Sequence, residues 1–207
     1  IIGQARFNAP FQTGNTWVFD PMAPAGSRWT TLVAELDEPR FFAGTAVIGE
    51  RIYLIGGITQ VTENDIVPHS AVSVLDTSAE TPVWRDDVAS PLPGPMFFNA
   101  AVAIPAGANV ERAGQIFTCG GYNGEFGNGA FWYDPATDAW SDARPTQKMR
   151  LLTRHLHLVP KPRGSSVWVV GGHYDGVYAD TEILYLGDDP VDCWTGVRTY
   201  PETVIPG

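Results

Sequence analysis

Three segments of the chain alternate apolar and polar positions and then end on a pair of glycines. They read RIYLIGG (51–57), GQIFTCGG (114–121) and SSVWVVGG (165–172). Alternation with this period indicates β-strands with one buried face. Glycine is favoured where a chain leaves a strand through a left-handed conformation or passes close to other backbone. The pattern therefore predicts an architectural role for the three pairs, Gly56 and Gly57, Gly120 and Gly121, and Gly171 and Gly172.

Two further landmarks recur with a period of about 55 residues. One is an apolar strand that ends on aspartate, in NTWVFDP, SAVSVLDT, AFWYDP and EILYLGDDP; the aspartates are Asp20, Asp76, Asp134 and Asp188. The other is a tryptophan a few residues later; these are Trp29, Trp84, Trp140 and Trp194. A partial copy of the glycine landmark, IIGQ, opens the chain. We therefore expect four copies of one repeat, with the four tryptophans equivalent and largely buried.

Each period divides into four short strands. In the second copy these are 40–48, 51–57, 70–76 and 82–88, with a tight turn at Gly49 and Glu50. Since no window has a helical period, the chain is predicted to be all-β. Four antiparallel strands per repeat of this length are typical of a propeller blade.

The combination of Gly-Gly after the second strand, aspartate after the third and tryptophan on the fourth resembles the kelch repeat over nearly the whole chain. The resemblance implies a kelch-type β-propeller segment with repeat units of roughly 1–39, 40–94, 95–149 and 150–200. The strands add up to about three and a half blades, and kelch rings usually have six or seven. We expect the segment to be part of a larger ring, with further blades from the rest of the protein or another chain. A closed four-bladed ring whose termini share a blade is the alternative.

Charge and hydropathy narrow the classes of partner. The 13 Lys and Arg against 23 Asp and Glu give a net charge of -10, which argues against nucleic acid. No apolar run approaches the roughly 20 residues of a membrane span, so no membrane insertion is expected. Cys119 and Cys193 are expected on strands of successive units, and we expect both thiols to be unpaired; a disulfide between them is the alternative.

Possible metal ligands are few, and no cofactor is expected. His155 and His157 share one face of a first strand and are weak candidates for a metal site. The loop ENDIVPHS, with Glu63, Asp65 and His69, resembles the iron-binding loop of the nitrile-specifier kelch proteins. Glu63 stands two residues before Asp65, however, where that motif has four.

A second enzyme comparison concerns the kelch-like oxidases related to galactose oxidase. The segment from PMFFNAAVAI to YDPATDAW is broadly similar to the start of their propeller. Phe98 and Asn99 stand where those enzymes carry their cross-linked cysteine, and Cys119 is on a different strand. The likeness is therefore that of the shared repeat.

The loops that follow the glycine pairs are the predicted binding surface, because loops on a rigid scaffold commonly carry function. They are rich in Gly, Asn, Asp and Tyr. The candidate binding residues are Asp65, His69, Tyr122, Asn123, Phe126, His173, Tyr174, Asp175 and Tyr178. The sequence favours a protein-interaction or scaffolding module with a protein partner. The alternatives are part of a kelch-type enzyme, such as a sugar epimerase or oxidase, and a carbohydrate-binding propeller.

Overall fold

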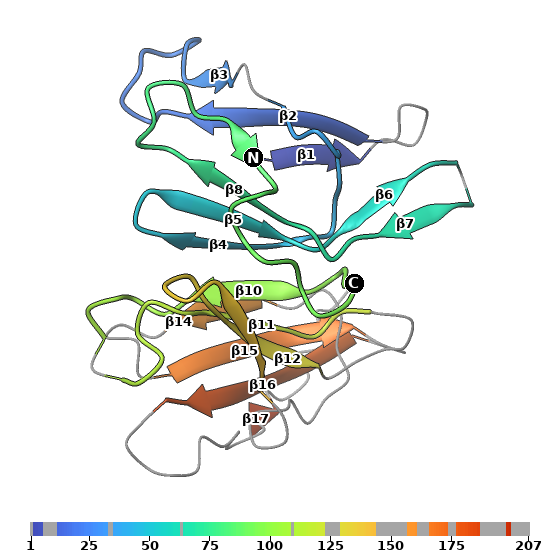
Figure 1. Ribbon diagram of the computed structural model, residues 1–207, viewed down its shortest axis with the longest axis vertical. Coiled ribbons are helices and arrows are strands. Elements are labelled where there is room, and N and C mark those ends of the chain that lie inside the picture. Colours follow the sequence, from blue (N-terminus) through green and yellow to red (C-terminus); the bar gives the residue numbers. More distant parts are fainter. Residues whose placement is uncertain are drawn as a thin grey trace, which may run out of the picture.

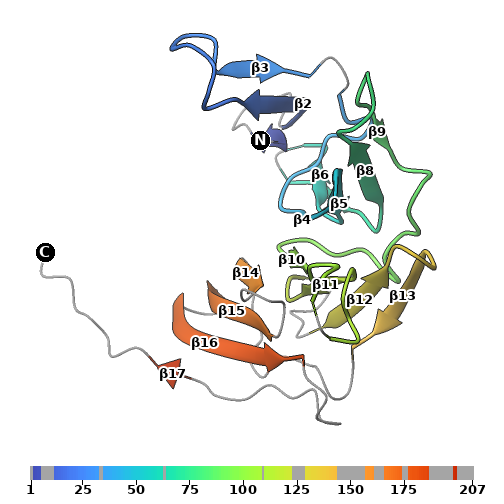
Figure 2. The same cartoon turned by 90° about the vertical axis from the view of Figure 1, so that its left-hand side faces the viewer.

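The computed structural model describes residues 2–5, 12–32, 35–62, 64–108, 110–122, 129–143, 157–160, 166–173, 177–186 and 198–199. Every regular element in these ranges is a β-strand, and four sheets follow one another along the chain. Figure 2 shows them fanned out in an arc, with β4, β10 and β14 at its inner side. The predicted all-β, kelch-type blade architecture is confirmed.

The sheets are built in chain order from antiparallel neighbours (Figure 1). The first sheet contains β1 (Ile2–Ala5), β2 (Gln12–Phe19) and β3 (Trp29–Thr31). The second contains β4 (Gly44–Ile48), β5 (Arg51–Ile55), β8 (Val72–Asp76) and β9 (Trp84–Arg85). A separate hairpin, β6 (Ile58–Gln60) and β7 (Ile66–Pro68), extends from it between β5 and β8.

The third and fourth sheets repeat the four-stranded order. The third contains β10 (Ala100–Ala103), β11 (Ile116–Cys119), β12 (Ala130–Asp134) and β13 (Ala139–Asp142). The fourth contains β14 (His157–Pro160), β15 (Ser166–His173), β16 (Val177–Tyr185) and β17 (Arg198–Thr199). The first sheet is therefore one strand short of the others within the part of the chain that is described.

The recurring aspartates shape the turn between the last two strands. In three sheets an aspartate Oδ1 accepts a hydrogen bond from the backbone N–H two residues later, at 2.8–3.0 Å; the aspartates are Asp20, Asp76 and Asp134. This is the Asx turn that aspartate forms readily. The residue before each aspartate then faces a tryptophan, in the pairs Phe19–Trp29, Leu75–Trp84 and Tyr133–Trp140. A shared register thus explains the constant spacing of the two landmarks.

The glycine pairs of the second and third sheets adopt left-handed conformations. The φ angles of Gly56 and Gly57 are 67° and 102°, and those of Gly120 and Gly121 are 73° and 86°. A Cβ on Gly56 would collide with the carbonyl oxygen of Met96, which also accepts a hydrogen bond of 2.8 Å from Gly57 N. Gly56 therefore lies against the backbone that leads into the third sheet, whereas Gly57 and Gly121 lie against the backbone that leads into the first strand of their own sheets. In the fourth sheet, β15 continues through the pair, with a register shift beside it.

Apolar clusters fill the spaces between successive sheets. The cluster between the second and third sheets includes Tyr53, Ile55 and Val74 from one side and Ile116 and Tyr133 from the other. A comparable cluster joins the third and fourth sheets through Phe117, Trp132, Val169 and Leu184. Between the first and second sheets the buried members are fewer: Leu36, Leu54, Leu75 and Trp84.

The tryptophans reach towards the preceding sheet, and their burial depends on it. Trp84 is 8% exposed and donates from Nε1 to Thr16 Oγ1 of β2 at 2.9 Å. Trp140 is half-buried and donates to the carbonyl oxygen of Ser90, in the crossover from the second sheet, at 2.8 Å. Trp29 is 53% exposed and packs on Phe19. The expectation of uniform burial is wrong for Trp29, because no described sheet precedes its own; Trp194 lies outside the described residues.

Candidate protein-interaction surface

A row of aromatic rings crosses from the second sheet to the third at the end where the glycine pairs lie. Successive ring centroids are 4.6, 4.3, 4.9 and 5.2 Å apart along Phe41, Phe42, Phe98, Phe97 and Tyr122. Contacts at these separations are favourable when the rings are tilted or edge-on, as they are here. We call these five residues the aromatic row. Phe42 is its most open member described, at 43% exposure.

The backbone holds this row in the same way in both sheets. Phe41 exchanges two backbone hydrogen bonds with Ile58 (2.9 and 3.0 Å), and Phe97 exchanges two with Tyr122 (2.8 and 3.1 Å). The next residues, Phe42 and Phe98, have φ values of 57° and 58°. A positive φ is unusual for a bulky side chain, and such strain persists only where the surroundings enforce it. Phe98 N also donates to Phe42 O at 2.8 Å, which joins the two sheets at this point.

The hairpin β6–β7 presents apolar side chains beside the row. Val61, Ile66 and Val67 are 57%, 45% and 46% exposed. Figure 1 shows the hairpin extending away from the sheets at the glycine-pair end of β5. A group of exposed apolar side chains on a projecting element is typical of a contact site for another protein.

His69 fastens the base of this hairpin. Its N–H donates to Gly57 O (2.9 Å), and its carbonyl accepts from Met96 N (3.1 Å). Its imidazole Nε2 lies 2.8 Å from Thr59 Oγ1, and Nδ1 lies 3.3 Å from a carboxylate oxygen of Glu38. Burial lowers the pKa of His69, and the Glu38 carboxylate opposes that shift. The side chain is 12% exposed, so its contacts are mainly internal ones that hold the hairpin in place.

The other predicted binding residues fall in different parts of the surface. Asp65 is exposed near the hairpin tip, where its carboxylate accepts from the Thr62 hydroxyl at 2.7 Å. Tyr122 is half-buried at the end of the aromatic row. Asn123, Phe126, Tyr174 and Asp175 lie outside the described residues, as does Glu63, and the side chains of His173 and Tyr178 are not described. The structure therefore brings Tyr122 into the row and leaves the joint role of the nine residues a prediction.

The remaining sequence candidates stay predictions for the same reason. His155 and Cys193 lie outside the described residues, and the side chain of His157 is not described. No group of three potential metal ligands occurs among the residues that the structure describes.

Cys119 is fully buried on β11. Asn99 is buried between sheets, where its amide donates to Ile55 O and Thr118 Oγ1 at 3.3 and 3.1 Å. Within the described ranges, no helix is long and apolar enough to cross a membrane.

Sequence reasoning missed the aromatic row. Its signal was the repeated Phe-Phe dipeptide, at Phe41–Phe42 and Phe97–Phe98, which falls just before the first strand of two successive units. Only the fold shows that these dipeptides come together, since they are separated by a whole repeat.

Comparison with known proteins agrees with this geometry. The kelch motif model matches residues 109–147, which include β11, β12 and β13. The chain is 29% identical over 122 residues to kelch domain-containing protein 10 of Rattus norvegicus and to its namesake in Mus musculus. The matched stretch is 57% of this chain and only 26% and 24% of those relatives. The kelch motif match, the repeated strands and the turn aspartates together show that the chain contains kelch repeats folded as β-propeller blades.

Proposed function

We propose that this kelch module binds a protein partner through the aromatic row and the β6–β7 hairpin. The observation that carries the proposal is the exposure of Val61, Ile66 and Val67 on a hairpin whose two strands pair with each other and not with the strands of the second sheet. An apolar side chain left in water favours association, because covering it releases about 25 cal/mol per Å² of apolar area.

The charged residues beside this surface indicate the kind of partner. Glu38 is 60% exposed at the base of the hairpin, and Asp65 is exposed near its tip. Interfaces commonly combine an apolar centre with a polar rim. We therefore expect the partner to present apolar side chains flanked by Lys or Arg, in keeping with the net charge of -10.

The test is site-specific photo-crosslinking followed by a binding measurement. A photoreactive amino acid at Val67 should capture one protein in stoichiometric yield, whereas the same group at Val83, 47% exposed elsewhere in the second unit, should not. With that protein purified, the double variant Ile66→Asp/Val67→Asp should weaken binding at least tenfold, while Val83→Asp leaves it unchanged. Equal binding by both variants would show that the hairpin is not the interaction surface.

A further inference from the structure

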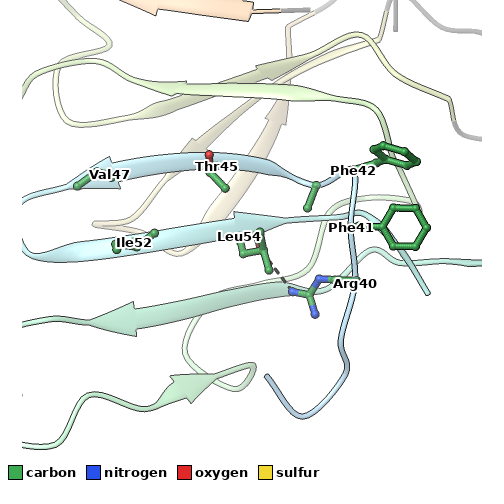
Figure 3. A pocket seen from close by; sticks show the side chains of 8 residues that line it. Arg40, Phe41, Phe42, Thr45, Val47, Ile52 and Leu54 are labelled. Carbon is green, nitrogen blue, oxygen red and sulfur yellow. Dashed lines mark hydrogen bonds between the residues drawn. The ribbon is translucent and has the colours of Figure 1, made fainter. Parts of the chain in front are cut away.

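The second sheet has a hollow on each of its two faces. One, of about 360 Å³, looks towards the first sheet (Figure 3), and its lining includes Thr45, Val47, Ile52 and Leu54. The equivalent face of β10 is covered by β4 of the adjacent sheet, so this hollow belongs to the packing between blades. The other hollow lies on the opposite face, between the second and third sheets, each of which has four described strands. A missing strand therefore does not explain it.

This second hollow is apolar at its base and charged around its opening. Its volume is about 290 Å³, and its lining residues are Arg51, Val74, Asp76, Ala79, Val83, Arg85 and Val88. Val74 is buried in the cluster shared with the third sheet, whereas Val83 and Val88 are exposed. Concave apolar surface with a few polar groups is typical of small-molecule sites. Since an apolar cavity of about 150 Å³ takes up benzene, this hollow has room for a two-ring aromatic molecule.

The third unit carries a large side chain at the equivalent position. In the second sheet, Val74 is opposite Tyr53. In the third, Trp132 is opposite Phe117, and like Val74 it stands two residues before the turn aspartate. Trp132 is buried, and the guanidinium carbon of Arg112 lies 5.2 Å from the centroid of its ring. The third unit thus places its own indole and guanidinium where the second unit has only a valine.

The connection between the first two strands of each unit accounts for the rest of the difference. Arg112 belongs to the connection between β10 and β11 (104–115), part of which packs on the cluster shared with the fourth sheet. In the second unit the corresponding connection is only Gly49 and Glu50, which is too short to cover Val74. The hollow therefore results from a small side chain and a short turn within an otherwise complete pair of sheets.

Two arginines at the opening of the hollow are already paired with carboxylates. Arg51 Nε lies 3.3 Å from Asp76 Oδ2, and Arg85 donates from Nε and Nη2 to the carboxylate of Asp87 at 2.9 and 2.8 Å. Because these carboxylates offset the positive charges, the site offers little attraction to an anion. A guanidinium whose edge is hydrogen-bonded still stacks on an aromatic face, and indole is the ring that cations favour most.

We propose that this hollow binds an uncharged two-ring aromatic molecule of the indole type. The ring lies on Val74 between Val83 and Val88 and stacks with the guanidinium groups of Arg51 and Arg85. The ligand thereby supplies the ring that the third unit supplies from its own chain. The charged groups around the opening favour a free small molecule over a side chain of another protein, since the centres of protein interfaces are depleted of charge. The site is separate from the β6–β7 hairpin.

The experiment titrates the 207-residue chain with 5-fluoroindole and follows the fluorine NMR signal. We expect saturable binding. Binding of 5-fluoroindole-2-carboxylate should be about tenfold weaker, because its charge meets the carboxylates of Asp76 and Asp87. Val74→Trp introduces the side chain of the third unit, fills the hollow and should weaken binding about tenfold while the thermal midpoint is kept. Val67→Trp, on the hairpin, is the matched control and should leave binding unchanged.

Two variants at exposed positions make the test independent of changes in the core. Val88→Glu places a charge in the hollow and should weaken binding about tenfold. Arg85→Ser introduces the residue that the third unit has opposite Trp132, which is Ser141, and should weaken binding about threefold, as expected of an exposed cation–π contact.

Four outcomes would overturn the proposal. The first is 5-fluoroindole binding that does not saturate. The second is unchanged binding by either Val74→Trp or Val88→Glu, and the third is equal affinity for the carboxylate. The fourth is capture of a protein by a photoreactive amino acid at Val83, which would assign the hollow to a side chain of that protein.

Discussion

The interface between the first and second sheets differs sharply from that between the second and third. At the latter, Tyr53, Ile55 and Tyr133 are nearly fully buried, and an inner strand is present on each side. At the former, Leu54, Leu75 and Trp84 are buried but Thr45 and Val47 are open. Both interfaces are built from the same repeat, so the difference lies in the neighbour. Many side chains of such a blade are therefore buried only by contact with an adjacent blade, as in other repeat proteins.

The largest effect should separate the two equivalent tryptophans. Trp84→Ala removes a buried ring and its bond to Thr16 and should cost about 3–5 kcal/mol of unfolding free energy, the usual range for a buried aromatic. Trp29→Ala, at 53% exposure, should cost less than about 1 kcal/mol, since surface substitutions usually stay within about 0.5 kcal/mol. Urea unfolding of both variants measures the difference. Equal losses would mean that burial against the preceding sheet does not distinguish them.

A glycine exchange probes the backbone contact at the more complete interface. Gly56→Ala should cost more than about 2 kcal/mol, because left-handed backbone costs about 1–2 kcal/mol for other residues and the new Cβ meets Met96 O. Gly49→Ala is the matched control, since its φ is 57° and a Cβ there meets nothing within 4 Å. The control should show the conformational cost alone. If the two variants unfold at the same urea concentration, the contact with Met96 contributes nothing.

Loss of the hydrogen bond between Trp84 and Thr16, which joins the first and second sheets, should have a smaller effect on the free energy of unfolding. Thr16→Val keeps the shape of the side chain and removes the acceptor of the Trp84 Nε1–H, so we expect a loss of about 1 kcal/mol. In the background of Trp84→Phe, which lacks the donor, the same exchange should be nearly neutral. A double-mutant cycle of unfolding free energies measures this coupling. A coupling near zero would show that the hydrogen bond does not join the two sheets.

The smallest expected effect concerns acid stability at the interface of the second and third sheets. The Asp138 carboxylate accepts from Ser90 N (2.7 Å), Tyr133 Oη (2.7 Å) and Ser90 Oγ (3.0 Å), and the backbone bond from Ser90 is the main reason that its pKa lies below the ordinary value. A lowered pKa means that the stabilisation is present above about pH 4 and is lost as the pH falls through the folded-state value.

Asp138→Asn tests this link. Asparagine also tolerates the positive φ of 49° at this position, so the exchange removes the carboxylate charge without straining the backbone. We expect the variant to have a lower thermal midpoint than the original chain at pH 7, with the gap narrowing between pH 4 and pH 2. A gap that is constant over this range would mean that the Asp138 carboxylate charge does not stabilise the fold.

The sequence alone determined the repeat and much of its local structure. Period-two alternation, Gly-Gly and the aspartate before each last turn are local requirements of strand pairing and turn geometry, and they could be read one unit at a time. Gly56 therefore has the left-handed backbone, and β8 the end at Asp76, that the pattern predicted. Strand ends were less predictable: the strand expected at 82–88 is limited to β9 (Trp84–Arg85), because hydrogen bonding to β8 stops there.

The tertiary structure alone decided what each repeated residue meets. Trp29 and Trp84 share a register but not a degree of burial, since burial depends on the sheet that lies against them. The ring centroids of Phe42 and Phe98 lie 4.3 Å apart, although a whole repeat separates the two residues in sequence. Arg40 and Met96 each directly precede a Phe-Phe dipeptide, yet only the packing shows that the Arg40 guanidinium is as deeply buried as the Met96 side chain. Local conformation follows from neighbouring residues, whereas contact between distant residues depends on how complete units assemble.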